Sequence, residues 1–143
     1  MRRYIEVPLQ LIDIEGEGFH IMVTGMIHGK EANFLIDTGA SRSVFDSKTI
    51  SNFIDDIQFE KKEGLTAGVG SSDLESSTFK IENFSIGDLE ITEYEAVALD
   101  LENIHEMYGK LGLPCIDGII GGDLLKRYKS VINYKGKKLR LTP

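Results

Sequence analysis

Two short strings in this 143-residue chain combine residue types that can do chemistry. In the first, FLIDTGAS at 34–41, an apolar run leads into a carboxylate, a hydroxyl and a glycine. A buried strand holds Asp37 in a fixed place, and Gly39 permits a tight turn that brings a backbone N–H close to the carboxylate. The Ser41 hydroxyl is a further hydrogen-bond donor for a carboxylate oxygen. A carboxylate positioned in this way is suited to general acid–base catalysis.

The second string is GIIGGDLL at 118–125, where a very short apolar strand lies between glycines. Asp, Thr, Gly and Ser are ordinary turn residues, so Asp-Thr-Gly alone is also typical of a strand that ends in a polar turn. The functional interpretation depends on both strings together, with the Gly- and Ser-rich segment Gly64–Asp73 between them.

Together these strings resemble the retropepsin-like aspartic proteases, the single-domain relatives of pepsin. The family's catalytic triplet matches Asp37-Thr38-Gly39, and its usual continuation matches Ala40-Ser41. Gly64–Asp73 lies where the family has its flap, a hairpin that closes over substrate, and Ile119-Ile120-Gly121 matches the segment that threads behind the catalytic loop. Asp123–Arg127 falls where the family has a short C-terminal helix. The resemblance implies an all-β, closed, barrel-like fold with one to three short helices.

The resemblance also implies the roles of individual residues. Asp37, Thr38 and Gly39 would be catalytic, and no metal or other cofactor is implied. Residues 100–117 are an insertion relative to compact viral members, and this insertion would alter the pocket or the dimer. The residues implied in substrate binding are Ala40, Ser41, Gly68, Val69, Gly70, Ile119 and Ile120, with Ile36 as a further pocket wall.

The mechanism that the resemblance implies needs two carboxylates, and the chain has one Asp-Thr-Gly. Asp117-Gly118 lacks the hydroxyl residue and is interpreted as a turn, and 143 residues are too few for two pepsin-like lobes. We therefore expect a symmetric homodimer in which Asp37 of each copy meets on the two-fold axis and hydrolyses a peptide or protein substrate. Two alternatives stay open: a catalytically idle dimerisation or peptide-binding module, and a monomer that stays idle until the pair assembles.

The amino-acid composition excludes several classes of protein. There are 16 Lys and Arg against 23 Asp and Glu, a net charge of −7, which argues against a general nucleic-acid binder. The single cysteine, Cys115, excludes an internal disulfide. No run of about 18 apolar residues and no signal peptide is visible, so we expect a cytoplasmic protein with no membrane partner. The length predicts a single domain over residues 1–143.

Hydrophobic patterning predicts the elements that position these residues. Alternation over 4–14 predicts a half-buried strand, and Pro8 places that strand at an edge or beside a bulge. Further strands are expected over 19–27, 32–36, 74–86, 89–99 and 119–120, with a closing hairpin of 130–134 and 137–141. Short helices are expected over 46–53, 101–111 and 124–129.

Overall fold

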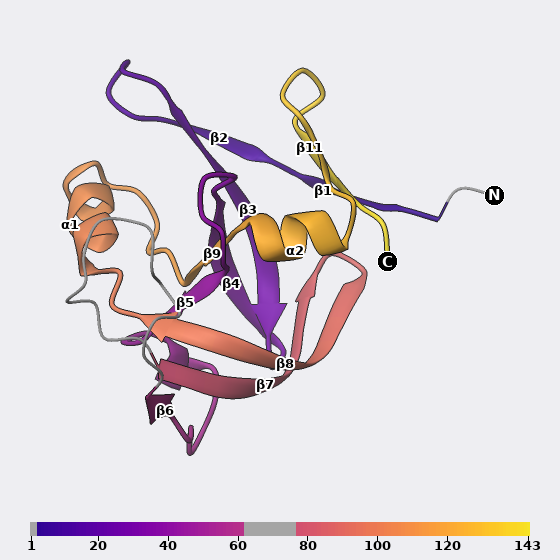
Figure 1. Cartoon of the computed structure of the whole chain (residues 1–143). Coiled ribbons are helices and arrows are strands. Elements are labelled where there is room, and N and C mark those ends of the chain that lie inside the picture. Colours follow the sequence, from indigo (N-terminus) through magenta and orange to yellow (C-terminus); the bar gives the residue numbers. More distant parts are fainter. Residues whose placement is uncertain (1–2, 62–76) are drawn as a thin grey trace.

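The computed structural model describes residues 3–61 and 77–143. Strands dominate the described residues, and two α-helices and one 3₁₀ turn accompany them (Figure 1). In chain order the elements are β1 (Ile5–Pro8), β2 (Gln10–Asp13), β3 (Phe19–Ile27), β4 (Lys30–Ile36), β5 (Val44–Asp46), η1 (Ile50–Asn52), β6 (Glu60–Lys61), β7 (Ser77–Ile86), β8 (Leu89–Leu99), α1 (Glu102–Lys110), β9 (Gly118–Ile120), α2 (Gly122–Arg127), β10 (Val131–Asn133) and β11 (Lys138–Leu141).

The larger sheet closes into a barrel. Its strand order is β2-β3-β4-β9-β5-β8-β7-β6, and β3 pairs additionally with β7. Because β3 contacts both β4 and β7, the strands β3, β4, β9, β5, β8 and β7 form a closed ring. The expected all-β, barrel-like fold with a few short helices is therefore confirmed.

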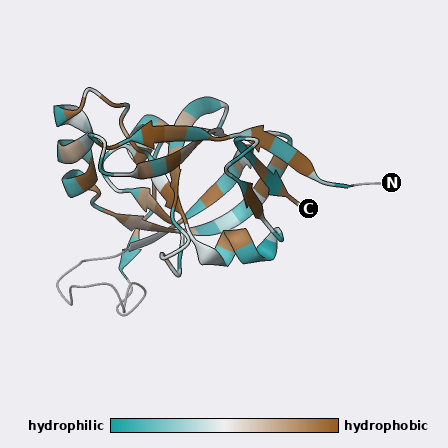
Figure 2. Cartoon of the chain, turned by 90° about the horizontal axis from the view of Figure 1, so that it is seen from above, coloured by the Kyte–Doolittle hydropathy of each residue, from teal (hydrophilic) through white to brown (hydrophobic). Residues whose placement is uncertain are grey.

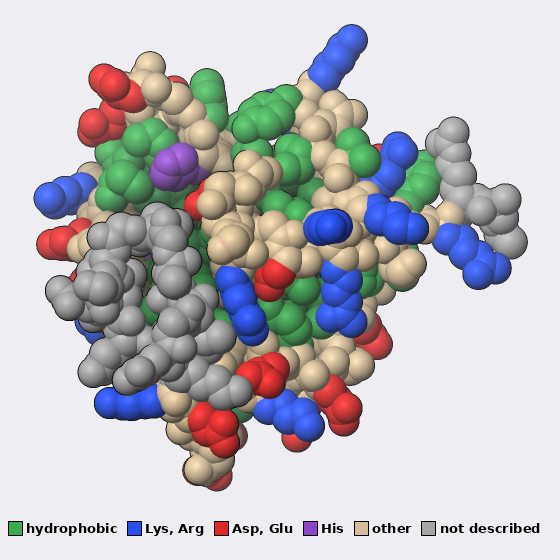
Figure 3. All heavy atoms as spheres, in the orientation of Figure 1, with side chains coloured by type: hydrophobic (Ala, Val, Ile, Leu, Met, Phe, Trp, Pro, Cys, Tyr) green, Lys and Arg blue, Asp and Glu red, His purple; other side chains and the backbone are tan. Residues whose placement is uncertain are grey.

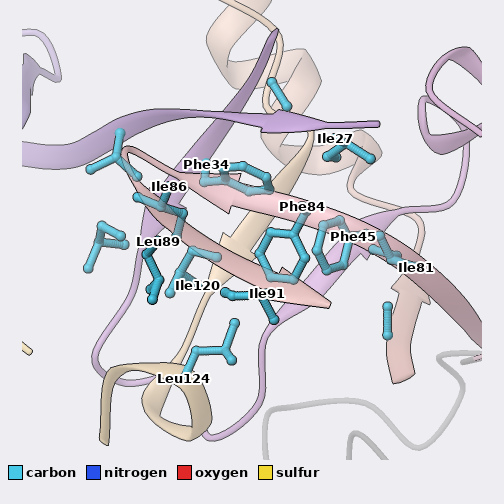
Figure 4. Close-up of a cluster of buried hydrophobic side chains, with 14 of the residues drawn as sticks. Ile27, Phe34, Phe45, Ile81, Phe84, Ile86, Leu89, Ile91, Ile120 and Leu124 are labelled. Atoms are coloured by element: carbon cyan, nitrogen blue, oxygen red, sulfur yellow. The ribbon is translucent and has the colours of Figure 1, made fainter. Parts of the chain in front are cut away.

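Phenylalanines from several strands fill the barrel. Phe34, Phe45 and Phe84 are fully buried, and Phe45 meets Phe34 and Phe84 edge-on at centroid distances of 5.8 and 5.4 Å. Figure 4 shows these rings surrounded by aliphatic side chains such as Ile120 and Leu124. Apolar and polar residues alternate along the strands (Figure 2), which is the pattern of strands with one buried face. This packing makes the end of β4 a rigid base for the residues that follow it.

A smaller sheet has the order β1-β11-β10. Its edge strand β1 contains Pro8, which agrees with the predicted edge position. The prediction of one continuous strand over 4–14 is wrong: the chain changes partners at Leu9, whose N–H donates to the Lys137 carbonyl. β1 pairs with β11, whereas β2 pairs with β3, so the alternating sequence is shared by two sheets.

The predicted strands over 19–27 and 89–99 are confirmed, as is the helix over 101–111, which is α1. The predicted helix over 46–53 is wrong. Asp46 ends β5 with a side chain that is 0 % exposed, and its carboxylate accepts the N–H groups of Thr49 and Leu101. Because that side chain joins two loops instead of starting a helix, only the 3₁₀ turn η1 forms. In the described part of the chain, no helix is long and apolar enough to cross a membrane.

Candidate active site

Asp37 lies directly after β4, at the start of a tight turn. Its backbone N–H donates to the Ile120 carbonyl of β9 (3.0 Å), which ties the turn to the barrel. The Gly39 N–H donates to Asp37 Oδ1 (2.9 Å), as Gly39 was predicted to do, and the Ala40 N–H donates to the Asp37 carbonyl (3.1 Å). The side chain is exposed, and no described residue hydrogen-bonds to Oδ2. The turn thus presents a fixed carboxylate with one oxygen available.

Strand β9 lies between β4 and β5 and supports this turn from behind. It runs parallel to β4, with Ile119 beside Leu35 and Ile120 beside Ile36. The chain then passes so close to the turn that a Cβ at Gly121 would lie 2.6 Å from the Ala40 carbonyl oxygen. The next N–H, that of Gly122, donates to the same carbonyl oxygen (2.7 Å). Only glycine fits the first of these positions.

A buried polar network holds the far end of the loop. The Ser43 hydroxyl donates to Asp123 Oδ1 (2.7 Å) and accepts the Gly121 N–H (2.8 Å). The Ser43 N–H donates to the same Asp123 oxygen (2.8 Å), and the Tyr94 hydroxyl donates to Oδ2 (3.2 Å). Burial, with the neighbouring Asp123 carboxylate adding to it, raises the pKa of Tyr94, so its hydroxyl stays a donor. Sequence reasoning assigned Asp123 to the start of a helix and did not find Ser43 or Tyr94.

An apolar groove of about 470 Å³ opens beside Asp37. The predicted wall residues Ile36 and Ile119 line it, whereas Ile120 is 2 % exposed in the main core and contributes its carbonyl to the turn. Ala40 and Ser41 lie in the turn outside this lining, and the predicted flap residues 68–70 lie outside the described residues. The groove lining comes from β3, β4, α1, β9 and β10 and consists of Phe19, His20, Ile21, Leu35, Ile36, Asp37, Thr38, Ile104, Ile119, Ile132 and Tyr134.

Among the described residues of that lining, Asp37 is the only carboxylate. The interpretation of Asp117-Gly118 as a turn is wrong, because Gly118 is the first residue of β9 and Asp117 pairs with Asn33 of β4 directly before it: Asp117 Oδ2 accepts the Asn33 N–H (2.9 Å), and the Asp117 N–H donates to the Asn33 carbonyl (2.8 Å). Burial raises the pKa of Asp117. Asp117 is therefore a structural carboxylate that joins the start of β9 to the middle of β4, outside the groove lining.

The insertion at 100–117 contributes to the groove. Its helix α1 places Ile104 in the lining and packs Tyr108 against the outer face of the sheet. His105 anchors the helix, since its Nε2 is 2.6 Å from the Ile116 carbonyl and 3.7 Å from the buried Asp46 carboxylate. The sequence analysis expected residues 100–117 to alter the pocket or the dimer, and Ile104 shows that they contribute to the pocket.

Charge is unevenly distributed over the chain. Residues 122–143 contain seven Lys and Arg and one acidic residue, Asp123, although the whole chain carries −7. On the face in Figure 3, Lys and Arg side chains gather over α2 and toward the termini. We call residues 122–143 the basic C-terminal segment.

Comparisons with known proteins agree with this arrangement. A family described as aspartyl protease matches residues 23–124, which contain both the Asp37 turn and β9. The match covers more than half of the chain, so the protein belongs to this aspartyl protease family. Among curated protein sequences, none matches the chain significantly.

Solved structures show the same fold. The retroviral protease-like domain of Ddi1 from Leishmania major is similar with a TM-score of 0.57 and 19% identity, over 85% of this chain and 87% of that one. A retropepsin-like aspartic protease from Rickettsia conorii is similar with a TM-score of 0.58 and 16% identity, over 96% of this chain and 89% of that one. The barrel is therefore of the retropepsin-like type.

Proposed function

We propose that the protein is a homodimeric aspartic endopeptidase whose active site contains Asp37 from each of two copies. One observation carries the proposal. Within the described residues, Asp37 is the single carboxylate lining the groove, it is fixed by β4 and by the Gly39 N–H, and its Oδ2 has no hydrogen-bond partner. A rigid, exposed carboxylate at a groove is suited to proton transfer, but this chemistry needs a second one.

The second copy supplies that carboxylate and makes the mechanism possible. Two adjacent carboxylates cannot both ionise readily, so the pair shares one proton, as in aspartic proteases generally. The ionised Asp37 takes a proton from a water, which attacks the peptide carbonyl, while the protonated Asp37 donates to the forming oxyanion. Proton transfer to the leaving amine then completes hydrolysis without an acyl-enzyme. Thr38 of each copy would hydrogen-bond across the axis and hold the two turns together.

The free edge of β10 is the surface that we assign to the second copy. Within the described residues, β11 is paired on both sides, but β10 is paired only with β11. Val131 and Tyr134 are 50% and 55% exposed, and Tyr134 and Ile132 line the groove of Asp37. An antiparallel pairing of β10 with β10 of the second copy covers this apolar edge and brings both Asp37 turns toward one axis.

The substrate in this proposal is an extended peptide with apolar side chains beside the cleaved bond. Ile119 supplies an apolar wall next to Asp37. Ala40 and Ser41 follow the proposed catalytic residues, and Gly68, Val69 and Gly70 are the further residues proposed to contact the peptide backbone. Small residues suit such backbone contacts because they let an added strand approach closely.

Cleavage of a mixed peptide library, measured over a range of enzyme concentrations, tests the activity. We expect wild-type protein to cleave, with specific activity falling on dilution as the dimer dissociates. Asp37→Asn should abolish cleavage, since it changes both members of the pair. Asp117→Asn is the matched control, because that carboxylate lies outside the groove lining, and it should cleave like wild type. Cleavage by Asp37→Asn contradicts the proposal, and binding without cleavage by wild type favours an idle peptide-binding module.

Sedimentation of an edge variant tests the assembly. Val131→Asp places a charge on the β10 edge and should shift the protein to monomer, with a parallel loss of activity. Met107→Asp is the control, since Met107 is also partly exposed (37%) but lies on α1 outside the groove lining. A Val131→Asp protein that remains dimeric would show that the copies meet elsewhere.

A further inference from the structure

We propose that His20 determines substrate specificity by presenting its Nε2–H to the groove beside Asp37. The enzyme then prefers a substrate whose side chain next to the cleaved bond accepts a hydrogen bond, as an amide or a carboxylate does. This inference rests on the proposed function, because it concerns the peptide held in the same groove.

The strand register places His20 across from Asp37. β3 and β4 are antiparallel, with Ile21 opposite Ile36 and Met22 opposite Leu35. The next position along this register sets His20 opposite Asp37, and both residues line the groove. Residues directly opposite on antiparallel strands have Cβ atoms about 5 Å apart. His20 is thus within reach of a peptide bound at Asp37.

Helix α1 fixes the histidine ring. Tyr108 is 1% exposed, and its hydroxyl is 2.7 Å from His20 Nδ1. The two rings also stack, with centroids 5.8 Å apart and planes inclined by 23°. A ring held by both a hydrogen bond and a stacking contact keeps one orientation in the groove wall. The insertion therefore sets the position of a β3 residue that lies 88 positions earlier in the sequence.

The same contact sets the tautomer. Burial raises the pKa of Tyr108 to about 12, so the hydroxyl is protonated at neutral pH. Among the described residues, His20 Nδ1 is the one acceptor that this hydroxyl meets. With Tyr108 as the donor in this contact, Nδ1 accepts its proton and the imidazole proton is on Nε2. Nε2 has no partner among the described groups, so its N–H is the donor that His20 offers to the groove.

The apolar residues around His20 let its N–H donor select between substrate side chains. His20 lies among apolar wall residues, including Leu35, Ile104 and Ile119. A peptide side chain that covers Nε2–H without accepting its proton leaves a desolvated donor unpaired, whereas an amide or carboxylate side chain satisfies it. We expect a preference of about tenfold for the accepting side chain, the lower part of the usual range, because His20 is only half-buried.

Matched peptides that differ only in Asn or Leu, two side chains of similar shape, measure this preference at each position around the cleaved bond. We expect wild-type protein to prefer Asn about tenfold in kcat/KM at one position. His20→Phe should lose or reverse that preference, and His20→Gln, which keeps an N–H donor, should retain it. Tyr108→Phe should weaken it, because Nδ1 loses its donor while the ring packing remains. Met107→Ala, on the same helix but outside the groove lining, is the control and should leave the profile unchanged.

Two readouts keep this test separate from catalysis. The ¹⁵N chemical shifts of the His20 ring report the tautomer directly, and we expect protonated Nε2 in wild type and a mixture in Tyr108→Phe. Binding of the same fluorescently labelled peptides to Asp37→Asn repeats the comparison without cleavage, so an inactive enzyme still gives an answer. Protonated Nδ1 in the wild-type protein, an unchanged Asn preference in a folded His20→Phe protein, or no peptide binding at all would each overturn the inference.

Discussion

Replacing Ser43 by alanine should loosen the loop that follows Asp37 from β9 and α2. Ser43 is 0 % exposed, and its hydroxyl both donates to Asp123 and accepts the Gly121 N–H. A hydrogen bond to a charged group contributes about 1.5–3 kcal/mol, and a buried N–H left unpaired costs about 1–3 kcal/mol. The two effects overlap, because the Ser43 N–H still donates to Asp123. We therefore expect a loss of about 3 kcal/mol in the free energy of unfolding, or roughly 10 °C in melting temperature.

Ser130→Ala is the matched control. The Ser130 hydroxyl is buried but has no hydrogen-bond partner among the described residues, so its removal should change stability by less than about 0.5 kcal/mol. Urea unfolding of both variants and wild type measures the difference, with an unchanged m-value showing that the unfolded state is not altered. A Ser43→Ala protein as stable as Ser130→Ala would refute the argument that this network holds the loop.

Three further predictions follow from the geometry. Gly121→Ala should destabilise the fold by about 3 kcal/mol or more, because its Cβ meets backbone atoms at 2.6–3.0 Å, whereas Gly122→Ala, with its nearest atom at 3.5 Å, should cost under about 1 kcal/mol by thermal unfolding. Burial raises the pKa of Asp117, so the folded state binds this proton more tightly than the unfolded state does, and the contribution of Asp117 to stability falls as pH rises above about 4. In urea titrations at several pH values, the stability of Asp117→Asn relative to wild type should therefore increase with pH. A decrease would contradict the prediction. Because pairing at β10 brings two basic C-terminal segments together, added salt should lower the dimer dissociation constant measured by sedimentation, and a rise would argue against this interface.

Local patterns predicted the parts of the fold that depend on neighbouring residues. Apolar runs bounded by glycine-containing turns identified the long strands over 19–27 and 89–99, and the apolar run before Asp37 identified the strand that positions it. Gly39 was assigned its role from the turn chemistry alone, and its N–H does contact the Asp37 carboxylate. Each of these features is determined by a few consecutive residues, so the sequence alone predicts it.

Contacts between residues far apart in the chain could not be predicted from the sequence. Ser43 meets Asp123 across 80 positions, and His20 meets Tyr108 across 88, so no short-range period records either pair. Asp46 was expected to cap a helix because aspartate commonly starts helices, but its carboxylate accepts the N–H of Leu101, 55 positions away, as well as that of Thr49. Side chains that join separate segments are determined by tertiary packing, and the residues of the polar network and the groove wall belong to this class.

The central claim is that one active site needs Asp37 from two copies, and mixing wild-type protein with Asp37→Asn tests it most directly. Total protein is kept constant, subunits are allowed to exchange, and peptide cleavage is measured as the wild-type fraction falls. If only wild-type pairs are active, an equal mixture retains about one quarter of the full activity, because random pairing makes the active fraction the square of the wild-type fraction. A linear decline, with about one half of the activity in the equal mixture, would show that each copy works alone and would contradict the account.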